Sequence, residues 1–181
     1  MKPKAQIMDA TALSRAMARI THEIIERNQG VEGLCLLGVK RRGIPLAGML
    51  SDNIRRFEGR EVPLGYLDIT LHRDDMTEQE KKNAAKECHI PCDIRDKKVI
   101  IVDDVIYTGR TARAAIEAVF AHDRPREVQL AVLIDRGHRE LPIRADYVGK
   151  NLPTSRSEMV SVRLDEVDGE TGVYICDRNN D

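Results

Sequence analysis

The stretch that most constrains the fold is residues 99–111, Val-Ile-Ile-Val-Asp-Asp-Val-Ile-Tyr-Thr-Gly-Arg-Thr. It begins with β-branched apolar residues, the composition of a strand that is buried on both faces. Two adjacent carboxylates follow, Asp103 and Asp104, then a short loop with Gly109, and then apolar residues at helical spacing from Ala112 onward. The pattern predicts a strand, an acidic pair, a loop and a helix, which is a repeating unit of a parallel α/β sheet.

The junction between this strand and this helix suits a sugar phosphate. The first turn of a helix leaves N–H groups unpaired at the positive end of the helix dipole, and a glycine lets the loop close on an anion. Carboxylates at the end of a strand lie where open α/β sheets bind ligands, and they accept hydrogen bonds from ribose hydroxyls. The alternative is an acidic turn whose threonines only cap a helix. The sequence contains no P-loop motif and no Gly-x-Gly-x-x-Gly after a strand, so a P-loop enzyme is excluded and a dinucleotide fold is disfavoured.

This stretch resembles the motif that binds phosphoribosyl diphosphate (PRPP) in type I phosphoribosyltransferases. The resemblance implies their α/β fold, a mainly parallel central sheet flanked by helices, with a small hood. It also implies that Asp103 and Asp104 hold the ribose hydroxyls. The loop that holds the 5′-phosphate would then consist of Val105, Ile106, Tyr107, Thr108, Gly109, Arg110 and Thr111.

Length and composition fit a single domain over residues 1–181. The chain is 41% hydrophobic and 33% charged with a formal net charge of −1, so it is not a general polyanion binder. The four cysteines form no disulfide pattern, and a metal half-site at Cys88 and Cys92 has no second ligand pair at matching spacing. No apolar run reaches membrane-spanning length and residues 1–10 lack a signal-peptide core, so we expect a cytoplasmic protein without membrane contact.

A second loop carries three consecutive cations. Residues 34–39 have the composition of a buried strand, and a glycine-bracketed loop with Lys40, Arg41 and Arg42 precedes a helix that begins at Ile44. Such a loop forms an anion site, although a basic surface turn has the same composition. In the family that the chain resembles, this loop binds diphosphate.

A long polar segment follows the alternating residues 62–71, which predict a strand. We predict that about residues 72–88 form a mobile flap. A flap that excludes water would protect the activated C1–diphosphate bond of PRPP from hydrolysis. By resemblance, Arg73 reaches the diphosphate from this flap and takes part in catalysis.

The last third of the chain is expected to build a base pocket. We predict a strand at residues 127–135, a short strand around Tyr147 and Val148, and an edge hairpin formed by residues 159–164 and 173–176. Loops at the same end of the sheet as the acidic pair supply backbone groups and apolar side chains for a base. The hood would comprise about 136–157 and the hairpin. The candidate base contacts are Arg136, Gly137, Val148, Lys150, Asn151 and Leu152.

Several segments are similar to the bacterial PyrR family, namely residues 135–146 and 149–155, and also 19–28, 68–75 and 164–169. Members of that family bind pyrimidine-operon mRNA when uridine nucleotides are abundant, and they also act as uracil phosphoribosyltransferases. The resemblance implies the reaction uracil + PRPP → UMP + diphosphate with Mg²⁺, held directly or indirectly by Asp103 and Asp104. It also implies transcriptional attenuation at the pyr operon mRNA leader in response to UMP or UTP, and a homodimer or homotetramer.

Basic residues on the predicted helix 11–28 lie off its apolar stripe, where a solvated helix surface is the simpler interpretation. By resemblance they join basic residues of the C-terminal loops in one RNA-binding surface. That surface would consist of Arg15, Arg19, His22, Arg27, His138, Arg139, Arg144 and Lys150. Two alternatives stay open: a salvage phosphoribosyltransferase without RNA binding, and an RNA regulator with vestigial catalysis.

Overall fold

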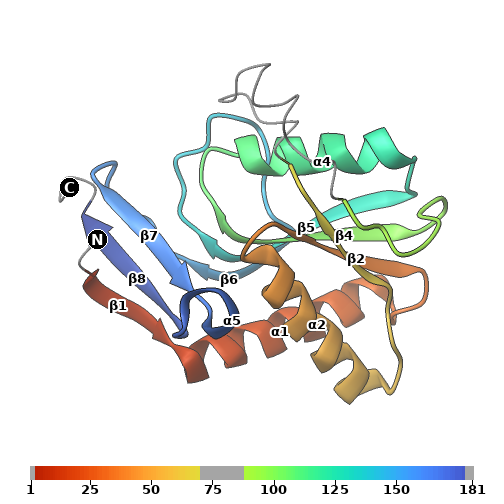
Figure 1. Ribbon diagram of the computed structural model, residues 1–181, viewed down its shortest axis with the longest axis horizontal. Coiled ribbons are helices and arrows are strands. Elements are labelled where there is room, and N and C mark those ends of the chain that lie inside the picture. The colour runs from red at the N-terminus through yellow and green to blue at the C-terminus, as the bar shows by residue number, and fades with distance from the viewer. Residues whose placement is uncertain (1–2, 70–87, 178–181) are drawn as a thin grey trace.

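The computed structural model describes residues 3–69 and 88–177. Its centre is a parallel sheet of five strands in the order β3-β2-β4-β5-β6 (Figure 1). Strands β2 and β4 are apolar and buried along most of their length, as expected for the middle of a parallel sheet. The predicted α/β class is therefore confirmed. The strands span Leu34–Val39 (β2), Leu64–Leu67 (β3), Lys98–Ile106 (β4), Glu127–Asp135 (β5) and Tyr147–Asn151 (β6).

Helices cover both faces of this sheet (Figure 1). Helices α1 (Ala10–Asn28) and α2 (Gly43–Glu58) share one apolar core with one face, and α4 (Arg110–His122) shares a second core with the other face. Helix α1 begins after Asp9, whose carboxylate accepts a hydrogen bond from the Ala12 N–H at 2.7 Å. Two crossover units, β2-α2 and β4-α4, thus deliver their loops to the same edge of the sheet.

A separate three-stranded antiparallel sheet, β1-β8-β7, forms the hood. Its strands are β1 (Pro3–Asp9), β7 (Glu158–Arg163) and β8 (Gly172–Asp177), and the short helix α5 (Asp165–Asp168) lies between β7 and β8. The predicted C-terminal hairpin belongs to this hood sheet, but the segment 136–157, also predicted for the hood, lies outside that sheet and contributes β6 to the central one. Strand β1 was not predicted, because five of its seven residues are exposed and its sequence shows no clear alternation.

Two other boundaries differ from those predicted. Strand β3 covers only residues 64–67 of the predicted 62–71, although Val62 and Ile69 are also buried. Strand β4 continues through the acidic pair to Ile106, so Asp103 and Asp104 lie within its last four residues and not after its end. Most of the predicted flap, including Arg73, lies outside the described residues. Within the described ranges, no helix is both long and apolar enough to span a membrane.

Candidate active site

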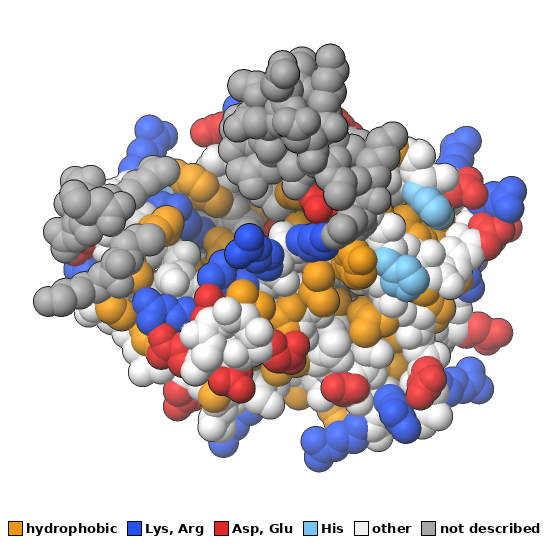
Figure 2. All heavy atoms as spheres, viewed as in Figure 1, with side chains coloured by type: hydrophobic (Ala, Val, Ile, Leu, Met, Phe, Trp, Pro, Cys, Tyr) orange, Lys and Arg blue, Asp and Glu red, His pale blue; other side chains and the backbone are white. Residues whose placement is uncertain are grey.

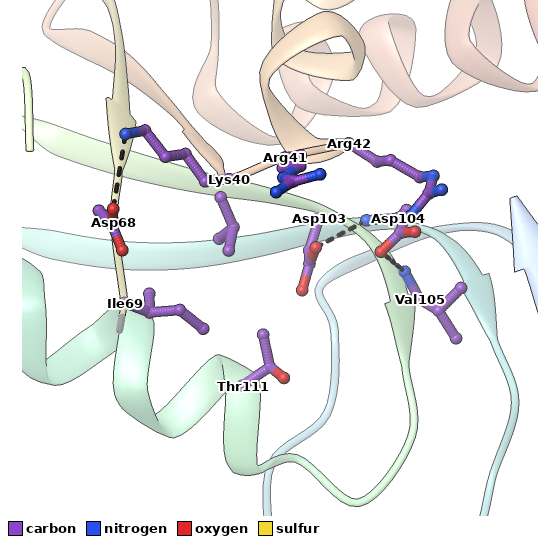
Figure 3. Close-up of a pocket in the computed structure, with 10 residues that line it drawn as sticks. Lys40, Arg41, Arg42, Asp68, Ile69, Asp103, Asp104, Val105 and Thr111 are labelled. Carbon is purple, nitrogen blue, oxygen red and sulfur yellow. Dashed lines mark hydrogen bonds and ion pairs between the residues drawn. The ribbon is translucent and has the colours of Figure 1, made fainter. Parts of the chain in front are cut away.

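The loops after β2 and β4 and the residues after β3 enclose a cavity of about 500 Å³. The first loop contributes its three cations, and the end of β4 contributes the acidic pair. Figure 3 shows Arg41 and Arg42 close to the acidic pair, whereas Lys40 is directed away from it toward Asp68. The lining residues are Val39, Lys40, Arg41, Arg42, Asp68, Ile69, Asp103, Asp104, Val105 and Thr111. The structure thus brings together both charged segments that the sequence analysis singled out.

Two glycines explain how closely the cationic loop approaches the acidic strand. A Cβ atom on Gly43 would lie 2.3 Å from the backbone oxygen of Val102, directly before the acidic pair. A Cβ atom on Gly38 would lie 2.5 Å from the backbone oxygen of Gly43. No side chain fits at either position, so the glycines set the distance between the start of α2 and β4. The peptide bond between Lys40 and Arg41 in this loop is cis.

The three cations of the loop diverge from one another (Figure 3). Lys40 extends to Asp68, 3.5 Å between Nζ and Oδ2, and its ammonium lies 5.2 Å from the centre of the Tyr66 ring. Arg42 leans to the opposite side, toward Asp104. Arg41 lies between them and is exposed. The loop therefore spreads positive charge along one wall of the cavity.

The acidic pair is poorly solvated. Asp103 is 9% exposed, and its carboxylate accepts a hydrogen bond from the Asp104 N–H at 2.9 Å, while the Asp104 carboxylate accepts one from the Val105 N–H at the same distance. Burial raises the pKa of Asp103 well above its ordinary value, and the negative charge of Asp104 raises it further. Burial also raises the pKa of Asp104. The pair is set to accept hydrogen bonds from a ligand or to bind a cation.

The phosphate loop, residues 107–111, forms a second and smaller cavity of about 110 Å³ at the start of α4. Gly109 occupies the position before the helix with φ of 94°, a conformation that favours glycine. The Thr108 hydroxyl accepts a hydrogen bond from the Arg110 N–H at 3.3 Å. Thr111 and Asp103 line both cavities, so a molecule with a sugar between two phosphate groups fits their arrangement.

A supporting loop, residues 137–143, holds the phosphate loop in place through hydrogen bonds to its backbone oxygens. The guanidinium of Arg139 donates to the backbone oxygens of Tyr107 at 2.8 Å and Ile143 at 2.9 Å, and pairs with Asp135 at 2.5 Å. The backbone oxygen of Thr108 accepts hydrogen bonds from the N–H groups of two residues of the supporting loop. The sequence analysis placed Arg139 on the RNA-binding surface and missed this role, because an i,i+4 spacing to an aspartate predicts a contact only within a helix, and this segment is a loop.

Comparison with known proteins agrees with this geometry. The model of the phosphoribosyl transferase domain matches residues 4–166. A protein of Clostridium botulinum described as bifunctional protein PyrR is 58% identical over 180 residues, which cover 99% of this chain and 100% of that protein. A protein of Thermus thermophilus with the same description is 57% identical over 178 residues, 98% of each chain. This chain belongs to the PyrR family.

Solved structures extend the likeness of this PyrR-family chain to more distant enzymes. A hypoxanthine-guanine phosphoribosyltransferase of Bacillus anthracis matches with a TM-score of 0.70 at 18% identity, covering 96% of this chain and 98% of that one. The hypoxanthine phosphoribosyltransferase of Trypanosoma cruzi matches with a TM-score of 0.73 at 17% identity, covering 97% of each chain. At these identities the likeness shows the fold alone, and that fold is the one predicted from the PRPP motif.

The predicted base contacts lie on two segments, β6 with the residue after it and the start of the loop after β5. Val148, Lys150 and Asn151 belong to β6, whose end lies beside the end of β5, and Leu152 follows directly with its N–H bonded to the Asp135 oxygen at 2.7 Å. Gly137 begins the supporting loop with φ of 80°. Arg136 is buried, in contrast, and its guanidinium stacks 4.0 Å from the centre of the Tyr107 ring while donating to the Thr154 hydroxyl at 2.8 Å.

The RNA contacts predicted from the PyrR resemblance are exposed, with the exception of Arg139. On α1, Arg15, Arg19, His22 and Arg27 are all exposed. Arg19 donates to the backbone oxygens of Val148 and Gly149, and Arg27 pairs with Asp146 at 2.7 Å, so this helix surface is continuous with β6. Lys150 is exposed on that strand, exposed Arg144 precedes it in the chain, and exposed His138 lies on the supporting loop. Arg139 differs because its guanidinium is turned inward to the phosphate loop.

Two further acids were not foreseen. Asp68 lies just after β3 and holds Lys40, and Asp168 in the hood pairs with Arg42. A carboxylate after a strand was a detectable signal for Asp68, but nothing in the sequence connects residues 42 and 168. The donor set of the acidic pair suits Mg²⁺, because that ion prefers carboxylate oxygens and completes its shell with substrate phosphates and water. In the described part of the chain, no group of three or more His, Cys, Asp or Glu side chains could hold a metal by itself.

Proposed function

We propose that this chain transfers the phosphoribosyl group of PRPP to uracil, producing UMP and diphosphate. The observation that carries the proposal is the meeting of three elements at two cavities that share Asp103 and Thr111: an acidic pair for ribose, a helix start for the 5′-phosphate and a cationic wall for diphosphate. The uracil preference rests on membership of the PyrR family and not on a described contact.

The reaction needs charge stabilisation and positioning more than a nucleophilic side chain. As the bond between C1 and the diphosphate oxygen breaks, positive charge develops on the ribose and negative charge grows on diphosphate. Lys40 and Arg41, with Arg73 outside the described residues, neutralise the leaving group. The ring nitrogen of uracil then bonds to C1 and its proton leaves to water or to Asp104. A bound Mg²⁺ would neutralise the phosphate oxygens, with Asp103 and Asp104 as its protein partners.

The acidic pair supplies the test of this assignment. Asp103→Asn and Asp104→Asn should each lower kcat/KM by about 10²- to 10³-fold, because Asn cannot carry the negative charge that faces the ribose. Asp52→Asn is the matched control, since Asp52 is exposed on α2 away from the cavity. Unchanged kinetics in both site variants would contradict the assignment.

The base is tested separately. UMP formation from uracil should be measured beside nucleotide formation from orotate, hypoxanthine and guanine, each with PRPP and Mg²⁺. Product from uracil alone supports the proposal, and product from another base alone overturns its specificity while keeping the enzyme class. No product from any base, together with UMP binding, would favour a dedicated regulator.

We also propose that the exposed basic surface of α1 and β6 binds the pyr operon mRNA leader and that UMP or UTP in the active site modulates this affinity. The supporting observation is the continuity between α1 and β6 made by Arg19 and Arg27. Homodimers or homotetramers would extend the surface. Few aromatic residues are present, 3% of the chain with no Trp, so phosphate contacts should dominate over base stacking.

The salt dependence of leader binding tests the RNA proposal. Affinity should fall steeply as salt rises, and Arg15→Ala should reduce the salt slope by roughly one contact. Arg124→Ala is the control, because Arg124 is exposed in the turn between α4 and β5. An affinity for RNA that does not change with salt would contradict the proposal. The interpretation of the chain as a salvage phosphoribosyltransferase without RNA binding would then remain.

A further inference from the structure

One hood residue contacts the cationic loop directly. Asp168 in α5 receives two hydrogen bonds from the guanidinium of Arg42, 3.1 Å from Nε and 2.7 Å from Nη2. The two residues are 126 positions apart in the chain. Figure 2 shows Lys and Arg side chains near the middle of this face, with acidic side chains of the neighbouring surface beside them.

The carboxylate of Asp168 is itself held in place. It accepts a third hydrogen bond, from the Leu164 N–H at 2.9 Å, and its side chain is only 18% exposed. Gly169 ends α5 with φ of 73° and closes the turn through a bond from its N–H to the Asp165 oxygen. The hydrogen bond from Arg42 lowers the pKa of Asp168, so the acid stays charged at neutral pH. Asp168 is therefore a fixed acceptor.

Arg42 has a second carboxylate within electrostatic reach. Its guanidinium interacts with the negative charge of Asp104 as well as with that of Asp168, and Arg42 lines the same cavity as Asp104. A bidentate pair with a fixed acceptor defines both the position and the orientation of a guanidinium. Without Asp168, the strongest remaining attraction on Arg42 among the groups described here is toward Asp104.

We propose that Asp168 is a positioning residue for the PRPP site: it anchors Arg42 from the hood, which keeps the Asp104 carboxylate available for the ribose hydroxyls. This inference rests on the proposed transferase function. It assigns a role to the segment 164–169, which the reaction chemistry leaves unused. The hood thereby contributes to PRPP binding without contacting PRPP.

Kinetics of Asp168→Asn test the role. This variant should raise KM for PRPP about tenfold, because Arg42 then competes with ribose for Asp104, while KM for uracil stays within about twofold. The Tm should fall by less than about 4 °C, as expected for a partly exposed ion pair. Glu170→Gln is the matched control: Glu170 pairs with Arg163 in the same hairpin and does not line the cavity. It should leave KM for PRPP unchanged.

A double variant separates positioning from mere support of the fold. In an Arg42→Met background, the substitution of Asp168 should have no further effect on KM for PRPP, since its action passes through Arg42. An unchanged KM in the single variant, or an equal rise with and without Arg42, would overturn the inference. If the wild-type chain forms no UMP, the transferase proposal fails by itself. The role of Asp168 is then decided by calorimetric PRPP affinities of wild type, Asp168→Asn, Arg42→Met and the double variant.

Discussion

The cationic loop and the phosphate loop hold anions by different means. The cationic loop offers long charged side chains, and each of the two whose partner is described is directed by an acid on another element: Asp68 for Lys40 and Asp168 for Arg42. The phosphate loop offers backbone N–H groups at a helix start, and a second loop supports it through Arg139. Side-chain charge is thus oriented by ion pairs with acids of other segments, whereas backbone dipoles are oriented by hydrogen bonds to a supporting loop.

This difference suits the two ends of PRPP. The 5′-phosphate stays bound to the same sugar atom through the reaction, so a rigid backbone cradle can hold it throughout. The diphosphate must be stabilised as its charge grows and then released, which favours flexible side chains of high charge. The predictions below test whether one loop depends on charge and the other on rigidity, beginning with the largest expected effect.

Gly43→Ala should have the largest effect on stability, because its Cβ atom would lie 2.3 Å from a backbone oxygen of β4. We expect a loss of about 3 kcal/mol in unfolding free energy and about 100-fold in kcat/KM, since the cationic loop must move away from the acidic pair. Urea denaturation and steady-state kinetics measure both quantities. The same substitution at Gly48 in α2 is the control, where a Cβ atom meets nothing within 4 Å. Gly48→Ala should stabilise the helix by up to about 1 kcal/mol; similar behaviour of the two variants would refute the close-approach argument.

Arg139→Met should damage the phosphate loop while leaving the cationic loop intact. The substitution removes charge-assisted hydrogen bonds to the backbone oxygens of Tyr107 in the phosphate loop and Ile143 in the supporting loop, so we expect a loss of about 2 kcal/mol in stability. The affinity for UMP, which carries the 5′-phosphate but no diphosphate, should fall about tenfold. Arg144→Met is the control because Arg144 is exposed. Weaker RNA binding by Arg139→Met with normal UMP affinity would assign Arg139 to the RNA surface after all.

The sequence predicted the local parts of this site better than the contacts between distant parts. The strand, the acidic pair, the loop and the start of the helix in and after residues 99–111 could be predicted because each depends on neighbouring residues: on their composition, on the position of a glycine and on the spacing of apolar residues. The exposed strand β1 and the Arg42–Asp168 pair depend on how the hood closes over the sheet, which no periodicity encodes. Arg139 shows the same limit, because a basic residue in a loop looks alike whether it faces solvent or a ring of carbonyls.

Asp103→Asn should raise stability while it lowers kcat/KM by about 10²- to 10³-fold. The folded protein raises the pKa of Asp103 above its unfolded value, so the folded state binds the proton more tightly. The resulting stabilisation is complete below the ordinary pKa of an aspartate and is lost as pH rises through the raised folded value. Asn does not ionise, so it avoids the cost of a buried charged carboxylate at neutral pH. The unfolding free energy of the ligand-free variant should therefore be about 1 kcal/mol higher than that of wild type at neutral pH. Thermal unfolding at pH 4 and pH 7.5 measures the gain, which should be larger at pH 7.5; an equal gain at both values would contradict the assigned cause.

The smallest expected effect separates charge from rigidity most directly. Arg41 is exposed on the cavity wall and forms no ion pair with any residue described here, so Arg41→Met should raise KM for PRPP by only about threefold. The effect should vanish at high salt, because salt screens an exposed charge. Thr108→Val should raise KM by a similar factor at every salt concentration, since it removes a hydroxyl from the rigid loop and no charge. Measured from about 0.05 to 0.5 M salt, two parallel curves would show that the loops bind anions alike. If KM approaches the wild-type value at high salt for Arg41→Met but not for Thr108→Val, charge acts on the diphosphate side and a preorganised backbone acts on the phosphate side.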